Sequence, residues 1–101
     1  MWELENVSVL FQELNIIAKE CGYFLSLNGS VLFKGYSEHD LDIVVCKYVD
    51  GADEESFINK VIIKLDGYLC CPKYEGIFAN AYVIEIMQHY QSHLIDISIR
   101  K

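Results

Sequence analysis

The chain has 101 residues, which is enough for one domain with a single hydrophobic core. Hydrophobic residues make up 52% of it and charged residues 23%, so the composition is that of an ordered globular protein and not of a disordered one. The net charge of −7 argues against a broad nucleic-acid-binding surface, because such surfaces neutralise phosphates with lysine and arginine. The composition therefore disfavours a nucleic acid as the partner.

The N-terminal sequence is acidic where a secretory signal would be basic, and no apolar run approaches the ~20 residues of a membrane span. The four cysteines, at positions 21, 46, 70 and 71, lack CxxC spacing and do not form a zinc ligand set with the three histidines. We therefore expect a cytoplasmic protein without a membrane partner, whose cysteines are reduced and mostly fill the core. The adjacent pair Cys70-Cys71 leaves a reactive site open as an alternative.

A first helix is predicted from about Leu4 to Cys21, where apolar residues recur at helical spacing, and Gly22 suits its end. Tyr23–Asn28 has the pattern of a short strand. The dipeptide Gly29-Ser30 then forms a turn. The segment 31–34 fits either a helical turn or a continued strand.

After a loop over Gly35–His39, a second strand is predicted from Asp40 to Tyr48. Leu41, Ile43 and Val45 alternate onto one of its faces. The other face begins with acids and then becomes apolar, which is typical of a central strand covered on both sides.

The second helix is predicted over Glu54–Leu65, with Asp53 as its N-cap and Gly67 at its end. Its buried face would contain Phe57, Val61, Ile62 and Leu65. A short strand at Tyr68–Cys71, a loop at Pro72–Gly76 and a hairpin of strands at Ala79–His89 and His93–Arg100 complete the chain. This order predicts an α/β (α+β) domain over residues 1–101, with a mixed sheet of about four or five strands and the helices on one face.

Three aspartates stand out on the predicted strands. Asp40 and Asp42 leave the same face of one strand, and Asp96 interrupts the isoleucines of another, although strands disfavour Asp. Solvated surface acids are the simpler interpretation. Carboxylates that converge can instead bind divalent cations, as in phosphoryl or nucleotidyl transfer sites.

Gly29-Ser30 has two interpretations as well. It is either a plain turn or a phosphate site, in which glycine lets the backbone approach and the amides and the Ser30 hydroxyl donate hydrogen bonds. If the last hairpin turns at residues 90–91, Glu85 lies opposite Asp96 and joins the acids. Four further residues are able to meet phosphates but are more simply explained as surface residues: Lys34, Ser37, Lys47 and Arg100.

Gly29-Ser30, Gly35, Asp40-Leu41-Asp42 and Asp96 together resemble the signature of the DNA polymerase beta-type nucleotidyltransferase superfamily in its minimal form. That pattern is Gly-Ser, a short spacer with Gly, Asp-x-Asp before apolar residues, and a third Asp on a later strand. The resemblance implies catalytic and metal-binding roles for Asp40, Asp42 and Asp96, which would hold two Mg²⁺, and nucleotide binding by Gly29 and Ser30.

The resemblance implies transfer of a nucleoside monophosphate from an NTP, expected to be ATP, to a hydroxyl of a protein or small molecule. Val31, Leu32 and Phe33 depart from the small residues common after Gly-Ser in the family, and no helical domain follows Asp96. These departures motivate an alternative, a catalytically inactive module that senses nucleotide or, like an antitoxin, neutralises a helical toxin. A homodimer through exposed strand edges also stays open. A chance motif in a small interaction domain would instead scatter the three aspartates in space.

Overall fold

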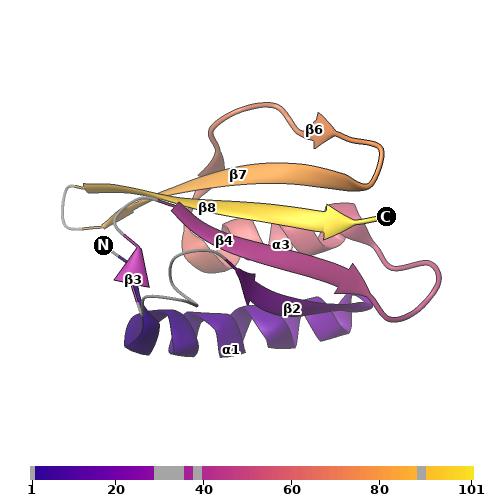
Figure 1. Cartoon of the computed structure of the whole chain (residues 1–101), viewed down its shortest axis with the longest axis horizontal. Helices are drawn as coiled ribbons and strands as arrows, with labels where there is room; N and C mark the ends of the chain where they lie inside the picture. Colours follow the sequence, from indigo (N-terminus) through magenta and orange to yellow (C-terminus); the bar gives the residue numbers. More distant parts are fainter. Residues whose placement is uncertain (1, 29–35, 38–39, 89–90) are drawn as a thin grey trace.

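The structure is a computed structural model that describes residues 2–28, 36–37, 40–88 and 91–101. Within these residues, two helices pack against a six-stranded mixed sheet (Figure 1), and two further strands form a separate two-stranded sheet. The elements in chain order are β1 (Trp2–Glu3), α1 (Leu4–Glu20), β2 (Tyr23–Asn28), β3 (Tyr36–Ser37), β4 (Asp40–Lys47), α3 (Glu54–Leu65), β5 (Tyr68–Leu69), β6 (Tyr74–Glu75), β7 (Ala79–Gln88) and β8 (Gln91–Arg100). The α/β (α+β) class predicted from the sequence is confirmed.

The sheet is organised around two parallel strands. Its order is β2-β4-β8-β7-β5, and β6 pairs with β7 beside β5. β4 and β8 run parallel, whereas β2 pairs antiparallel with β4 and β7 pairs antiparallel with β8. The two strands that carry the sequence motif's aspartates are therefore direct neighbours in the middle of the sheet (Figure 1).

Side-chain alternation gives the sheet one covered and one open face. The covered face packs against α1 and α3, and its residues on the central strands are buried: Leu41, Ile43, Val45, Tyr82, Ile84, Ile86, Ile95, Ile97 and Ile99. The helices contribute Leu14, Ala18, Phe57, Ile58 and Val61 to the same core. The open face, as we call it, is formed by the alternate residues of the central strands, among them Asp42, Val44, Ala81, Asp96 and Ser98, which are only half-buried.

The prediction that β4 is covered on both sides is wrong. Both helices lie on one face, so Val44 and Cys46 on the opposite side of the strand stay half-buried. Apolar residues on the second face of β4 therefore line an accessible surface and do not form a second core.

The predicted boundaries of the longer elements agree with the structure. β2 and α3 match residue for residue, and α1 ends one residue before the predicted limit. The Asp53 side chain caps α3 by accepting a hydrogen bond of 3.1 Å from the Ser56 amide. At the other end, Asp66 is the C-cap in the left-handed conformation at φ 52°, one residue before the glycine that was predicted to stop the helix.

The sheet has more strands than predicted because two-residue strands carry no periodicity. β6 lies inside the segment expected to be a loop, and β3 pairs with β1 although neither was predicted. The cysteine prediction also fails in part: Cys21 is buried, Cys46 is half-buried, and Cys70 and Cys71 are exposed; all four are free thiols. In the part of the chain that the structure describes, no helix is long and apolar enough to cross a membrane.

Two glycines in the left-handed region, one after α1 and one between β4 and α3, allow the cost of backbone strain to be separated from the cost of a steric clash. Gly22 has φ 93°, and a Cβ there would lie 2.7 Å from Val49 Cγ2 and 3.0 Å from Ala52 Cβ. Gly51 has φ 82° but no atom within 4 Å of such a Cβ. We expect Gly51→Ala to lower the free energy of unfolding by about 1–2 kcal/mol, the strain of a left-handed L-residue alone. Gly22→Ala should lower it further because of the clash, and equal losses in urea unfolding would contradict this.

Candidate functional site

Asp42 of β4 and Asp96 of β8 lie side by side. They are register partners in the parallel pairing, so their backbones are about 4.8 Å apart, the spacing of neighbouring strands. Both belong to the open face, and both are half-buried. The structure thus brings together two aspartates that are 54 positions apart in the sequence.

A cavity of ≈ 410 Å³ opens over these two residues. Its lining comes from the three central strands β4, β8 and β7: Asp42, Ile43, Val44, Ala81, Tyr82, Asp96, Ile97, Ser98 and Arg100. Two carboxylates, a hydroxyl and a guanidinium therefore share one hollow. Sequence alternation had already placed Ser98 and Arg100 on the face of Asp96, although Arg100 was expected to be an ordinary surface residue.

The other motif residues are covered only in part. The backbone of Asp40 pairs with that of Leu94 at the start of β4, two residues before Asp42, but its side chain lies outside what the structure describes. Gly29, Ser30 and Gly35 also lie outside the described residues. Asn28, which precedes Gly29 in the sequence, pairs with Asp42. Whether the third carboxylate and the Gly-Ser turn converge on the pair stays a prediction.

Two adjacent carboxylates on one face repel each other unless a cation or a basic group lies between them. None of the four salt bridges among the described residues involves Asp42. Carboxylate oxygens are the ligands that Mg²⁺ takes from proteins, so the pair fits a divalent cation. The described side chains alone include no group of three or more His, Cys, Asp or Glu that could hold a metal ion. A full three-carboxylate site would therefore depend on Asp40.

Glu85 does not join the acids as predicted. In the antiparallel pairing of β7 and β8 it is the partner of Leu94, and Val83 is the partner of Asp96. Gln88 pairs with Gln91, so the hairpin turns one position earlier than expected and the partners shift by two residues. The Glu85 carboxylate instead accepts a hydrogen bond from the Tyr68 hydroxyl of β5.

A second polar cluster, which no sequence pattern predicted, joins α3 to β7 on the covered side of the sheet. The Glu54 carboxylate accepts hydrogen bonds from the Tyr82 hydroxyl at 2.6 Å and from Asn80 Nδ2 at 3.1 and 3.2 Å. Lys73 Nζ lies 3.4 Å from the same carboxylate and 3.1 Å from Glu75. The residues that contact Glu54 are 19 to 28 positions away from it in the sequence, so no local motif could predict the cluster.

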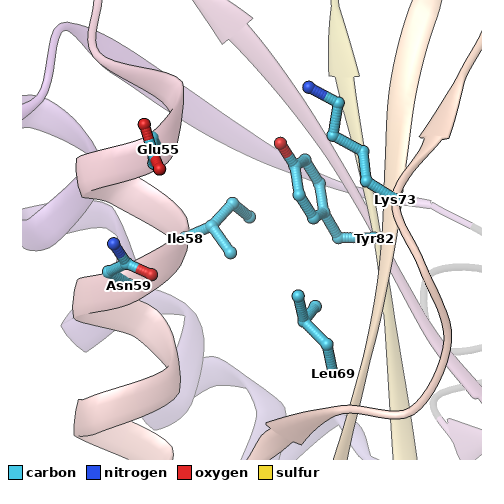
Figure 2. A pocket seen from close by; sticks show the side chains of 6 residues that line it. All are labelled: Glu55, Ile58, Asn59, Leu69, Lys73 and Tyr82. Atoms are coloured by element: carbon cyan, nitrogen blue, oxygen red, sulfur yellow. The ribbon is translucent and has the colours of Figure 1, made fainter.

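This cluster borders a groove of ≈ 340 Å³ between α3 and β7. Figure 2 shows Ile58 of α3 facing Tyr82 across the groove, with Lys73 beside the tyrosine ring and Leu69 at the other end. Burial and the hydrogen bond to Glu54 raise the pKa of Tyr82 to about 12. Burial by itself would raise the pKa of Glu54, but the hydrogen bonds from Tyr82 and Asn80 and the charge of Lys73 lower it overall. The hydrogen bonds and the ion pair of Glu54 are all made within the chain, so the cluster links the start of α3 to β7.

Comparison with known proteins finds similarity at the level of the fold. No family model matches the chain, and no curated protein matches it. The solved structure of a cytoplasmic RNA terminal U-transferase superposes with a TM-score of 0.64 at 16% sequence identity. The match covers 96% of this chain and 29% of that protein, so the chain spans less than a third of its length. The chain therefore has a nucleotidyltransferase-like fold.

The Glu54 cluster generates a pH-dependent prediction. Because the folded state lowers the pKa of Glu54, its stabilisation is fully present above the ordinary value of 4.5 and is lost as the pH falls through the lowered value. We expect Glu54→Gln to reduce the free energy of unfolding by about 1–2 kcal/mol at neutral pH, and by progressively less on acidification below about 4.5. Urea unfolding at several pH values measures this. Glu55→Gln, in the same helical turn, serves as the control and should show no such pH dependence.

A second prediction concerns the repulsion within the aspartate pair. In EDTA and at low ionic strength, Asp42→Asn should raise the free energy of unfolding by a few tenths to about 1 kcal/mol, because it removes a like charge next to Asp96. Asp50→Asn, in an exposed turn, changes the net charge equally and should have little effect. If Asp42→Asn destabilises the protein under these conditions, the two carboxylates do not repel each other as described.

Proposed function

We propose that this chain is a metal-dependent nucleotidyltransferase domain that transfers a nucleoside monophosphate from an NTP to an acceptor hydroxyl. The observation that carries the proposal is the in-register placement of Asp42 and Asp96 on neighbouring parallel strands, within one cavity on the open face. The nucleotidyltransferase-like fold, which is similar to that of an RNA terminal U-transferase, supports it.

The proposed roles follow from position. Asp42 and Asp96 hold the divalent cation, for which we propose Mg²⁺ and, with Asp40 as the third carboxylate, two ions. A bound cation of this kind neutralises charge on the transferring phosphoryl group and lowers the pKa of a coordinated hydroxyl. Gly29 and Ser30, which follow the Asp42-paired Asn28 in the sequence, bind the β- and γ-phosphates.

In the proposed reaction the acceptor oxygen attacks the α-phosphorus of the NTP. The new bond joins that oxygen to the α-phosphorus, and the bond from the α-phosphorus to the oxygen bridging to the β-phosphorus breaks. Pyrophosphate leaves with that oxygen, and the acceptor proton passes to the Asp96 carboxylate and then to water. Asp96 lies on β8, which borders β4 on the side away from β2, and this order supports an acceptor on the β8 side of the pair.

Label transfer tests the proposal. The protein is incubated with α-³²P-labelled ATP, or each other NTP, with Mg²⁺ and a cell lysate, and labelled products are separated. We expect Asp42→Asn and Asp96→Asn each to reduce transfer by roughly 100-fold or more, as for the loss of a group that stabilises transition-state charge. Glu85→Gln, an acid on the same face but away from the pair, should leave transfer unchanged.

Two further measurements separate the proposal from its alternative. Mg²⁺ with ATP should raise the melting temperature of the wild type and not of Asp42→Asn, since a ligand that binds only the folded state stabilises it. Nucleotide binding without transfer to any acceptor would contradict the enzyme and support a nucleotide sensor. Absence of both binding and transfer would leave a domain that acts through a protein partner.

A further inference from the structure

Arg100 is the cation in the lining of the cavity on the open face. It lies at the end of β8 and lines the same cavity as Asp42 and Asp96. The salt bridges among the described residues use Lys60, Lys64 and Lys73, and none involves Arg100. In a chain with a net charge of −7, this cavity therefore holds a guanidinium that no described carboxylate neutralises.

The far end of the cavity also has room beside Arg100. The β7 residues paired with Ser98 and Arg100 are Ala81 and Ala79, the smallest side chains after glycine. Ser98 stands between Asp96 and Arg100 on the same face, so the strand offers a carboxylate, a hydroxyl and a guanidinium at successive alternate positions. At about 3.3 Å per residue, the backbones of Asp96 and Arg100 are roughly 13 Å apart.

An anion at Arg100 would differ from the triphosphate of the proposed reaction. The Gly29-Ser30 segment follows β2, which borders β4 on the side away from β8. Asn28, the last residue of β2, pairs with Asp42 near the start of β4, whereas Arg100 follows Ile99, the partner of Val45 near the end of that strand. The end of β2, after which the proposed phosphate-binding residues follow in the sequence, and Arg100 thus lie on opposite sides of the aspartate pair and toward opposite ends of β4.

We propose that Arg100, assisted by the Ser98 hydroxyl, binds an anionic group of the acceptor. The acceptor is then a compound whose reactive hydroxyl and anionic group, a phosphate or a carboxylate, lie within roughly 13 Å of each other. A guanidinium suits both anions because its fork of donors matches two oxygens at once. This inference rests on the proposed function for the identity of the reaction, but the anion site itself depends only on Arg100, Ser98 and the space beside them.

Three small probes isolate the charge: glycerol 3-phosphate, glycerate and uncharged glycerol. Binding to the ¹⁵N-labelled protein in the presence of Mg²⁺ is followed by NMR chemical shifts. We expect at least one anionic probe to bind tenfold or more tightly than glycerol, with shifts at the amides of Ser98 and Arg100. The anion that binds more tightly distinguishes a phosphate-bearing from a carboxylate-bearing acceptor.

Matched variants test the residue. Arg100→Ser should weaken binding of the preferred anionic probe tenfold or more, whereas Lys101→Ser, the neighbouring cation outside the cavity lining, should change it less than twofold. Arg100→Lys should restore part of the affinity, since it keeps the charge but not the fork. Equal binding by Arg100→Ser and wild type, equal binding of glycerol and both anions, or no binding of any probe overturns the proposal.

The two proposals can fail separately. Binding of Mg²⁺-ATP, measured by calorimetry, should be the same in Arg100→Ser as in the wild type, because Arg100 is assigned to the acceptor. If ATP does not bind but the anionic probe binds through Arg100, the proposed transferase function is contradicted and the anion site is supported. If ATP binds and Arg100→Ser weakens ATP instead of the probe, the acceptor site falls and the nucleotide site stands.

Discussion

The parallel pairing of β4 with β8 is the constraint on which the rest of the molecule depends. One register fixes both faces at once: it aligns Ile43 with Ile97 on the covered face and Asp42 with Asp96 on the open face. A shift of a single residue would move the isoleucines to solvent and the aspartates into the core, which the burial of the isoleucines strongly opposes. Burial of the apolar face therefore holds the two carboxylates side by side.

The helices contribute to the site because they cover one face of the sheet and leave the other face open. α1 and α3 both pack on the isoleucine face, so neither helix covers the opposite face of β4 and β8 (Figure 1). The Glu54 cluster connects the start of α3 to β7 through Tyr82. Tyr82 pairs with Ile97 of β8, which in turn pairs with Ile43 of β4. The tie stabilises the covered side of the same three strands whose other side forms the cavity.

Sequence patterns predicted features that depend on nearby residues. Asp53 and the apolar spacing after it set the bounds of α3, and strand alternation put Asp96 and Arg100 on one face. Cross-strand partners were harder to predict, because the position of the hairpin turn determines them. An error of one residue in the turn changed the predicted partner of Glu85 to Asp96, whereas its partner in the structure is Leu94. The bonds from Tyr82 and Asn80 to Glu54 were beyond prediction, since they arise only after β7 packs beside α3.

The distribution of charge favours a ligand with one localised anionic group over an extended polyanion. A net charge of −7 repels polyanions at a distance, and the aspartate pair repels them at close range unless a cation is bound. Arg100 places a positive charge at one end of the cavity, where the small side chain of Ala81 is also part of the lining. The proposed acceptor, with one localised anionic group, would meet the guanidinium there while its neutral part lies over the carboxylates. The same register that places the isoleucines in the core thus places charges of both signs in one cavity.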